Sequence, residues 1–78
     1  MNKDITHVEH LGGTRLRLTF EDDVKRDVDV SDLVRFTGVF EPLRDPSFFR
    51  RVRVNPEIGT IVWPNGADLC PDVLYATR

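Results

Sequence analysis

The sequence offers little from which a disulfide framework, a metal centre or a cofactor site could be built. Its 78 residues include one cysteine, Cys70, so no disulfide can form within the chain and a thiolate metal site would lack ligands. Its two histidines, His7 and His10, have an odd spacing, which on a strand sends the rings to opposite faces. We therefore expect no metal site, no cofactor and a reducing compartment.

Long apolar runs and a secretory start are also absent. The longest apolar runs are a few residues, far below the roughly 20 that a membrane helix needs. The start Met1-Asn2-Lys3-Asp4 lacks the charged-then-apolar pattern of a signal peptide. A net charge of −2 is too small to predict a polyanionic partner. We expect a cytoplasmic protein that does not contact membranes.

What remains is the composition of a small folded domain. Hydrophobic residues make up 40% of the chain and charged residues 31%, which is ordinary for a globular protein. A chain this short holds one core and buries roughly 60% of the surface that its unfolded form exposes. There is no repeat, linker or low-complexity stretch, so residues 1–78 are expected to form a single α+β domain. The small core favours a stabilising partner or self-association.

Alternating residues predict an antiparallel meander. Apolar and polar residues alternate over 15–20, the period of a strand with one buried face, and the pattern resumes over 24–30 after an acidic loop. A slip by one residue would place carboxylates in the core, so the register is specified. The register that satisfies both faces pairs Leu16 with Val28, Arg17 with Asp27 and Arg15 with Asp29, with Phe20 facing Val24.

A third strand is predicted upstream, over residues 5–10. Gly12 and Gly13 follow it and can adopt the positive φ that a hairpin turn requires. Pairing Val8 with Leu16, and Glu9 with Arg15, gives the better match of faces. A two-residue Gly12-Gly13 turn is the alternative.

Two short helices are predicted between the strand groups. The first is capped by Ser31 or Asp32, whose side-chain oxygens accept from unpaired amides, and it runs through residue 36 to end at Gly38. The second is more clearly marked, with Asp45 at the capping position and Pro46 at the first helical position. One of the two phenylalanines at positions 48 and 49 is expected in the core.

A second hairpin and a last helix complete the predicted fold. Pro56 and Gly59 favour a turn after residue 55, and Pro64-Asn65-Gly66 favours another before a short helix over 71–75. Both strand groups can belong to one sheet. The hairpin pairs Val54 with Ile61 and Val52 with Trp63, which leaves Arg51, Arg53, Thr60 and Val62 on the opposite side, and Leu69 and Leu74 are expected to face inward.

No residue set predicts catalysis. The candidate nucleophiles Ser31, Ser47 and Cys70 each have a simpler role, as a helix cap, a first-turn residue and a small buried or capping side chain. Neither common glycine-rich phosphate loop is present. We therefore do not expect an enzyme.

The segment over residues 63–68, W-P-N-G-A-D, is the most unusual part of the chain. In the structural interpretation Trp63 closes the core, and Asp68 accepts amides that an irregular backbone leaves unpaired. In the functional interpretation Trp63 or Tyr75 lies at the rim of the domain as an anchor for a partner protein, where aromatic residues are enriched. The structural interpretation is favoured. The candidate partner-binding residues are Trp63, Asn65, Asp68 and Tyr75.

Arginines provide the alternative. Arg44, Arg50, Arg51 and Arg53 are the nearest approach to a basic patch, and such patches bind phosphates. Neighbouring acidic residues weaken that interpretation. Nucleic-acid contact by this group is therefore the second hypothesis.

Two motifs resemble a known bacterial family. The pattern L-R-D-P-x-x-F occurs at 43–49, and W-P-N-G-A-D-L-x-P-D-x-L-Y occurs at 63–75. Both are similar to signatures of the bacterial domains of unknown function called DUF2442, and the likeness covers nearly the whole chain. The resemblance implies a small α+β domain, alone or joined to a helix-turn-helix domain, and often encoded beside another small protein in what look like toxin–antitoxin pairs. It implies no established activity and no assigned site residues.

Together these observations predict a non-catalytic, protein-binding regulatory or antitoxin-like module, whose partner is another protein or a second copy. The alternative is a nucleic-acid-binding accessory domain that uses the four arginines.

Overall fold

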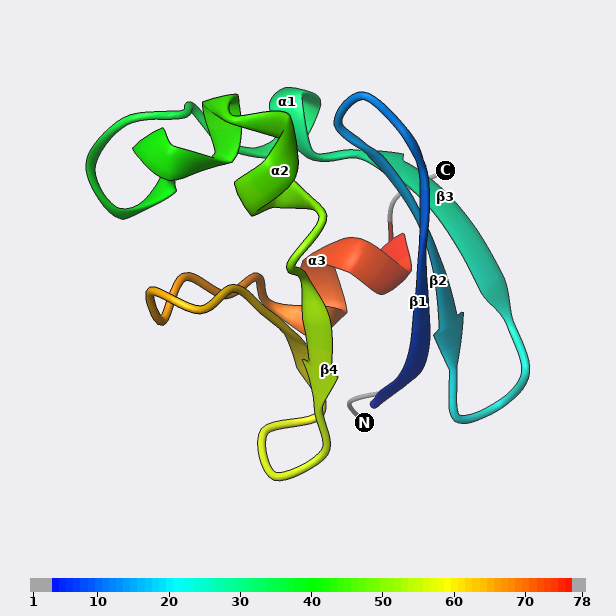
Figure 1. The fold of residues 1–78 in the computed structure, drawn as a ribbon. Coiled ribbons are helices and arrows are strands. Elements are labelled where there is room, and N and C mark those ends of the chain that lie inside the picture. The colour runs from blue at the N-terminus through cyan, green and yellow to red at the C-terminus, as the bar shows by residue number, and fades with distance from the viewer. Residues whose placement is uncertain (1–3, 77–78) are drawn as a thin grey trace.

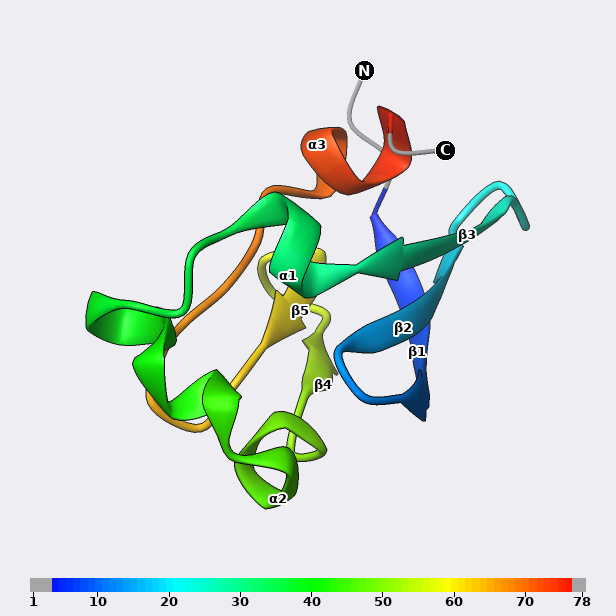
Figure 2. The same ribbon diagram turned by 90° about the horizontal axis from the view of Figure 1, so that it is seen from above.

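The computed structural model describes residues 4–76, apart from the side chains at positions 72 and 76, and has the α+β architecture predicted (Figure 1). In Figure 2 the two helices of residues 38–49 lie on the same side as the second hairpin, residues 53–62, and away from the three-stranded sheet. The elements are β1 (Ile5–Gly12), β2 (Arg15–Phe20), β3 (Lys25–Asp29), α1 (Val30–Leu33), the 3₁₀ helix η1 (Gly38–Arg44), α2 (Pro46–Phe49), β4 (Arg53–Asn55), β5 (Thr60–Val62) and α3 (Pro71–Ala76).

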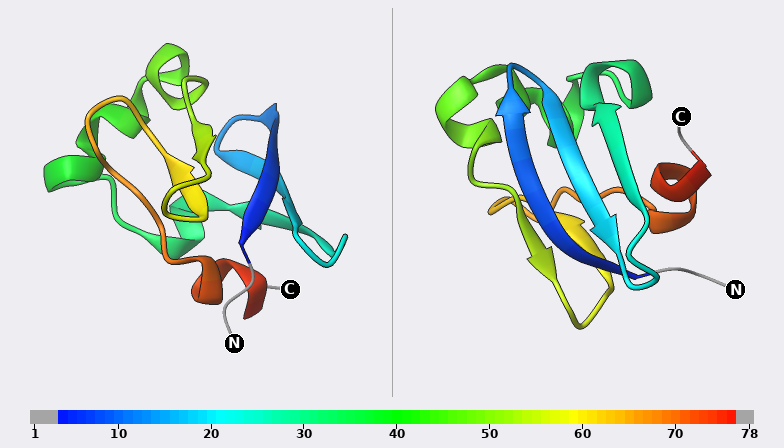
Figure 3. Two further views of the ribbon diagram at one scale, coloured as in Figure 1. Left: turned by 90° about the horizontal axis from the view of Figure 1, so that it is seen from below. Right: turned by 90° about the vertical axis from the view of Figure 1, so that its right-hand side faces the viewer.

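The strands form two sheets, not one. The order is β1-β2-β3 in the first sheet and β4-β5 in the second, all antiparallel (Figure 3). The amide of Ile5 on β1 donates to the carbonyl of Gly59 in the β4–β5 turn over 2.9 Å, so the sheets touch at one end. No described helix is long and apolar enough to cross a membrane.

The predicted register of β2 with β3 is confirmed: Leu16 lies opposite Val28, and Arg17 opposite Asp27. The predicted register of β1 is wrong, because His10 and not Val8 lies opposite Leu16. The turn residues are at 13 and 14, Gly12 pairs with Arg15, and the register shifts between His10 and Gly12. Neither the favoured pairing nor the Gly12-Gly13 turn allowed for this bulge at position 11, which inserts one residue into the ladder.

Helix α1 is capped by Asp29, not by Ser31 or Asp32. One oxygen of the Asp29 carboxylate accepts from Ser31 N at 3.0 Å, from Ser31 Oγ at 2.7 Å and from Thr14 Oγ1 at 2.5 Å. The helix therefore starts two or three residues earlier than predicted and ends at Leu33. Gly38, expected at its end, has φ +57° and begins the separate helix η1, which was not predicted.

The caps make the fold acid-sensitive. Hydrogen bonds from Thr14 and Ser31 hold the pKa of Asp29 below its ordinary 3.8, and those from Ser47 lower the pKa of the Asp45 cap of α2. A carboxyl whose pKa is lower in the folded state stabilises the fold above its unfolded pKa, and this contribution is lost as pH falls through the folded pKa. The melting temperature of the wild type should therefore fall between about pH 5 and pH 2.

Substituting the cap isolates this effect. In Asp29→Asn the fall in melting temperature, followed by circular dichroism, should be smaller, since the amide cannot be protonated over this range. Asp32→Asn is the matched control, because Asp32 lies in the first turn of the same helix and has no hydrogen bond in the described part of the chain. If the melting temperatures of both variants fell with pH as much as that of the wild type, Asp29 would not be a source of the acid sensitivity.

The core lies between the inner face of the first sheet, the β4–β5 hairpin and the helices. The cap at Asp45 and the burial of one phenylalanine, Phe49, are confirmed. So are the pairing of Val54 with Ile61 and the inward positions of two leucines. The buried apolar residues are Ile5, Leu16, Leu18, Phe20, Val28, Val30, Leu43, Phe49, Ile61, Val62, Trp63, Ala67, Leu69 and Leu74.

Part of the second hairpin is covered on the face opposite Ile61. Thr60 and Val62 are buried although they lie on the face opposite Ile61, because the segment after β5 folds back over them. Thr60 Oγ1 donates to the carbonyl of Leu69 over 2.6 Å, and Val62 forms a bridge with Asp68. Cys70, expected to be buried or capping, is exposed, and its carbonyl accepts from Leu74 N over 3.2 Å, which places it at the capping position before α3.

Candidate functional site

Trp63 belongs to the core. Its side chain is 1% exposed, its ring lies 5.7 Å from that of Phe49, and its indole Nε1 donates to the Phe49 carbonyl over 3.0 Å. Trp63 therefore closes the core, as the structural interpretation of the motif at 63–68 expected. A partner would find no tryptophan on the described surface.

Asn65 and Asp68 shape the chain around Trp63. The Asn65 amide donates to the carbonyl of Val39 in η1 over 2.8 Å, and its oxygen accepts from Ala67 N at 3.2 Å. Asp68 is exposed, and its backbone pairs with Val62. The side chain of Asn65 thus fastens the loop to η1.

Tyr75 fastens α3 to the β2–β3 hairpin. Its hydroxyl donates to Asp22 Oδ2 over 2.7 Å, and this hydrogen bond is the main cause of a raised pKa of Tyr75. Its ring stands edge-on to Phe20 at 4.9 Å, and the Arg26 guanidinium lies 5.2 Å above the ring. The residue is half-buried, and its described contacts hold the fold together.

The four arginines are all exposed but do not share one role. Arg44 Nε donates to the Phe36 carbonyl over 2.9 Å, which fixes the loop before η1. For Arg50, Arg51 and Arg53 no side-chain hydrogen bond or ion pair occurs within residues 4–76. These three follow α2 and lead into β4, so they remain available for a ligand.

No ligand set for a metal ion is present among the residues described, since no three His, Cys, Asp or Glu side chains converge. The expected opposite orientation of the histidines agrees with their environments. His10 is half-buried with its ring 5.6 Å from Phe49, whereas His7 is exposed.

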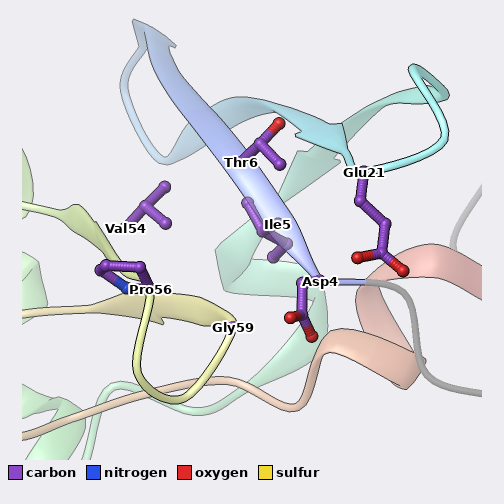
Figure 4. A pocket seen from close by; sticks show the side chains of 7 residues that line it. All are labelled: Asp4, Ile5, Thr6, Glu21, Val54, Pro56 and Gly59. Carbon is purple, nitrogen blue, oxygen red and sulfur yellow. The ribbon is translucent and has the colours of Figure 1, made fainter.

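A groove lies where the two sheets meet, and Figure 4 shows its walls. It has a volume of about 430 Å³. Apolar side chains from β1 and β4 form its floor, and two carboxylates stand on one side of it. We call it the edge groove, and it is lined by Asp4, Ile5, Thr6, Glu21, Val54, Pro56 and Gly59.

The edge groove lies at one end of the space between the facing edges of β1 and β4. In an antiparallel ladder the N–H and C=O of successive residues point alternately to either side. The main-chain N–H and C=O groups of Thr19 and Arg17 on β2 point toward β1. Those of their partners on β1, His7 and Glu9, therefore point toward β2. Val8 and His10 on β1, and by the same rule Val54 on β4, then direct their main-chain groups toward the space between the sheets.

These main-chain groups have no partner across that space. Between β1 and the β4–β5 hairpin, the bond from Ile5 N to Gly59 O is the one backbone hydrogen bond within the described range. The edges of β1 and β4 therefore run side by side without forming a ladder. Unpaired strand edges are templates for pairing with another chain.

No pattern in the sequence indicated this groove. Asp4, Thr6 and Glu21 match no motif, and they meet Val54 only because Ile5 and Gly59 are in contact. The one local hint was Gly59 in a turn. Its φ of +69° is left-handed, and the Asp4 carboxylate occupies the space where a Cβ would lie.

Comparison with known proteins identifies the family. The family model described as "Protein of unknown function (DUF2442)" matches residues 5–78, and the chain belongs to this family. No curated protein and no solved structure matches the chain.

Proposed function

We propose that this DUF2442 domain is a non-catalytic module that binds a partner protein, and that the edge groove receives an extended segment of that partner. The observation that carries the proposal is the apolar floor of the groove together with two unpaired strand edges, one at Val54 in the groove and one that continues along β1 beyond it at Val8 and His10. An extended peptide satisfies such an edge through its main chain and fills pockets with alternate side chains. No chemical step is required of the groove residues.

The charge of the groove indicates which segment fits. Asp4 and Glu21 are exposed, and their carboxylates lie beside the apolar floor (Figure 4). Complementary charge sets register and selects partners. We expect a segment that alternates apolar side chains with lysine or arginine. A regulatory or antitoxin-like role would follow if that segment is one that the partner needs for its own activity.

Charge reversal in the groove tests the proposal. Purified wild type, immobilised and incubated with lysate of the source organism, should retain a stoichiometric protein partner. Glu21→Lys should weaken retention at least about tenfold, since it replaces attraction by repulsion at the groove. Glu41→Lys is the matched control, because it makes the same charge change on η1, outside the groove.

Two results would contradict the proposal. One is the absence of any stoichiometric partner. The other is a partner that Glu21→Lys retains as well as Glu41→Lys does, with both variants folded by circular dichroism.

A further inference from the structure

We infer that the outer edge of β3 is a self-complementary surface on which a second copy of the chain pairs antiparallel, joining two three-stranded sheets into one of six strands. The inference is separate from the edge groove, which lies at the other end of the strand order, beyond β1.

β3 is the outermost strand of its sheet, with no strand beside its outer edge (Figure 3). Phe20 N donates to Val24 O, and Val30 N donates to Thr14 O, so the even-numbered residues of this stretch turn their main-chain groups toward β2. The N–H and C=O of Lys25 and Asp27 therefore point outward. Within the part of the chain that is described, no backbone group bonds to them, and the Lys25 carbonyl accepts from Nη1 of Arg26 over 3.3 Å, which leaves its second lone pair for a partner's amide.

The side chains on this edge match a second copy. Lys25 and Asp27 are both exposed and lie on the outer face of the sheet, since their partners on β2 are Thr19 and Arg17. A row of equal charges would repel a copy of itself, which is how many edge strands stay unpaired. Lys25 and Asp27 do not form such a row. A two-fold axis through Arg26 sets Lys25 opposite Asp27 of the second copy, and the symmetry makes each such contact twice.

The axis at Arg26 is favoured by the contacts that the neighbouring charged side chains already make. An axis at Asp27 would set Asp27 opposite Asp27 of the second copy, which is unfavourable, and Lys25 opposite Asp29, whose carboxylate already accepts from Thr14 and Ser31. With the axis at Arg26, the residues that exchange main-chain hydrogen bonds are Lys25 and Asp27, whose groups point outward. Arg26 itself turns to the inner face, where its Nε donates to the Tyr75 carbonyl over 3.1 Å and its guanidinium lies over the Tyr75 ring. The axis sets Arg26 opposite Arg26 of the second copy, and these contacts hold each guanidinium on its own α3.

Asp27 can keep its ion pair with Arg17 and also bind Lys25 of the second copy. It already forms an ion pair with Arg17, at 2.8 Å from Nε to Oδ1, yet its side chain is 41% exposed. A carboxylate has about four acceptor positions, so an ammonium group can be added without breaking the existing pair. The short edge predicts a weak, concentration-dependent dimer, because small interfaces are typical of transient association.

Charge reversal with a mixing experiment tests the dimer. Sedimentation velocity of the wild type over a wide concentration range should show a monomer–dimer equilibrium. Lys25→Glu sets two acids opposite each other and Asp27→Lys sets two bases, so each variant alone should dimerise at least about tenfold more weakly, the change being repeated by symmetry. An equimolar mixture of the two variants should recover association. In the mixed dimer the introduced glutamate of one chain faces the introduced lysine of the other, and the retained Asp27 faces the retained Lys25.

A second measurement ties the dimer to this edge. Amide hydrogen exchange of Lys25 and Asp27 should slow as protein concentration rises, whereas exchange of Val8 on the far edge should not change. A monomeric wild type, a mixture that fails to associate, or edge amides whose exchange is independent of concentration would each overturn the inference. The lysate experiment with Glu21→Lys is unaffected by these outcomes, so the two proposals fail separately.

Discussion

Replacing Trp63 with alanine is expected to remove a large part of the stability of the domain, about half of it at the middle of the usual range. A buried tryptophan truncated to alanine costs about 3–5 kcal/mol. A chain of 78 residues has a total free energy of unfolding of about 4–12 kcal/mol at the usual 0.05–0.15 kcal/mol per residue. Trp63 is 1% exposed and packs on Phe49, so little of this cost can be relieved by solvent. Urea unfolding followed by far-ultraviolet circular dichroism measures the loss.

Trp63→Phe separates packing from hydrogen bonding. The phenyl ring keeps much of the apolar contact but cannot donate to the Phe49 carbonyl, which would keep only the longer bond from Val52 N at 3.3 Å, and the loss of one hydrogen bond costs about 0.5–1.5 kcal/mol. We therefore expect the free energy of unfolding of Trp63→Phe to lie between those of the wild type and Trp63→Ala. Tyr75→Phe is the control, since it removes one hydroxyl from a half-buried ring. Wild-type stability in Trp63→Ala would show that the indole is not part of the core.

Gly59→Ala should destabilise the protein and deform the edge groove. Gly59 has φ +69°, and a left-handed conformation costs an alanine about 1–2 kcal/mol. The added Cβ would also overlap the Asp4 carboxylate. Gly66→Ala is the matched control, because Gly66 has φ +88° with no atom within 4 Å of an added Cβ. Gly59→Ala should therefore lose more stability than Gly66→Ala in the same urea titration.

A double variant identifies the source of the difference. If the overlap with Asp4 is responsible, Asp4→Ala should reduce the additional cost of Gly59→Ala toward that of Gly66→Ala. Equal losses for the two glycine variants, with or without Asp4, would show that the contact between residues 4 and 59 does not matter.

Local chemistry predicted the elements whose signals are local. Asp45-Pro46 marked the start of α2 because a cap and a first-turn proline act within one turn. The β2–β3 register followed from charges that cannot be buried. The cap of α1 was missed because Asp29 also fitted the strand pattern, and Thr14, which donates to it, lies in another turn. The register of β1 was predicted wrongly because the bulge at position 11 is not marked by a characteristic residue type in the sequence.

The candidate site could not be predicted for a related reason. The aromatic and polar residues of the motif at 63–68 stood out in the sequence, but burial and the bond to Val39 give them structural roles. The edge groove consists of ordinary residues whose proximity depends on how two sheets meet. Periodicity identifies which face of a strand is buried, but it does not say which edge remains unpaired.

The buried indole also gives the chain an internal optical probe. Trp63 is the one tryptophan in the sequence, so fluorescence excited in its absorption band comes from a single position enclosed by the core. It does not line the edge groove and does not lie on β3. A titration that leaves this emission unchanged while another signal moves reports an event at the surface, and one that shifts it reports a change in the interior.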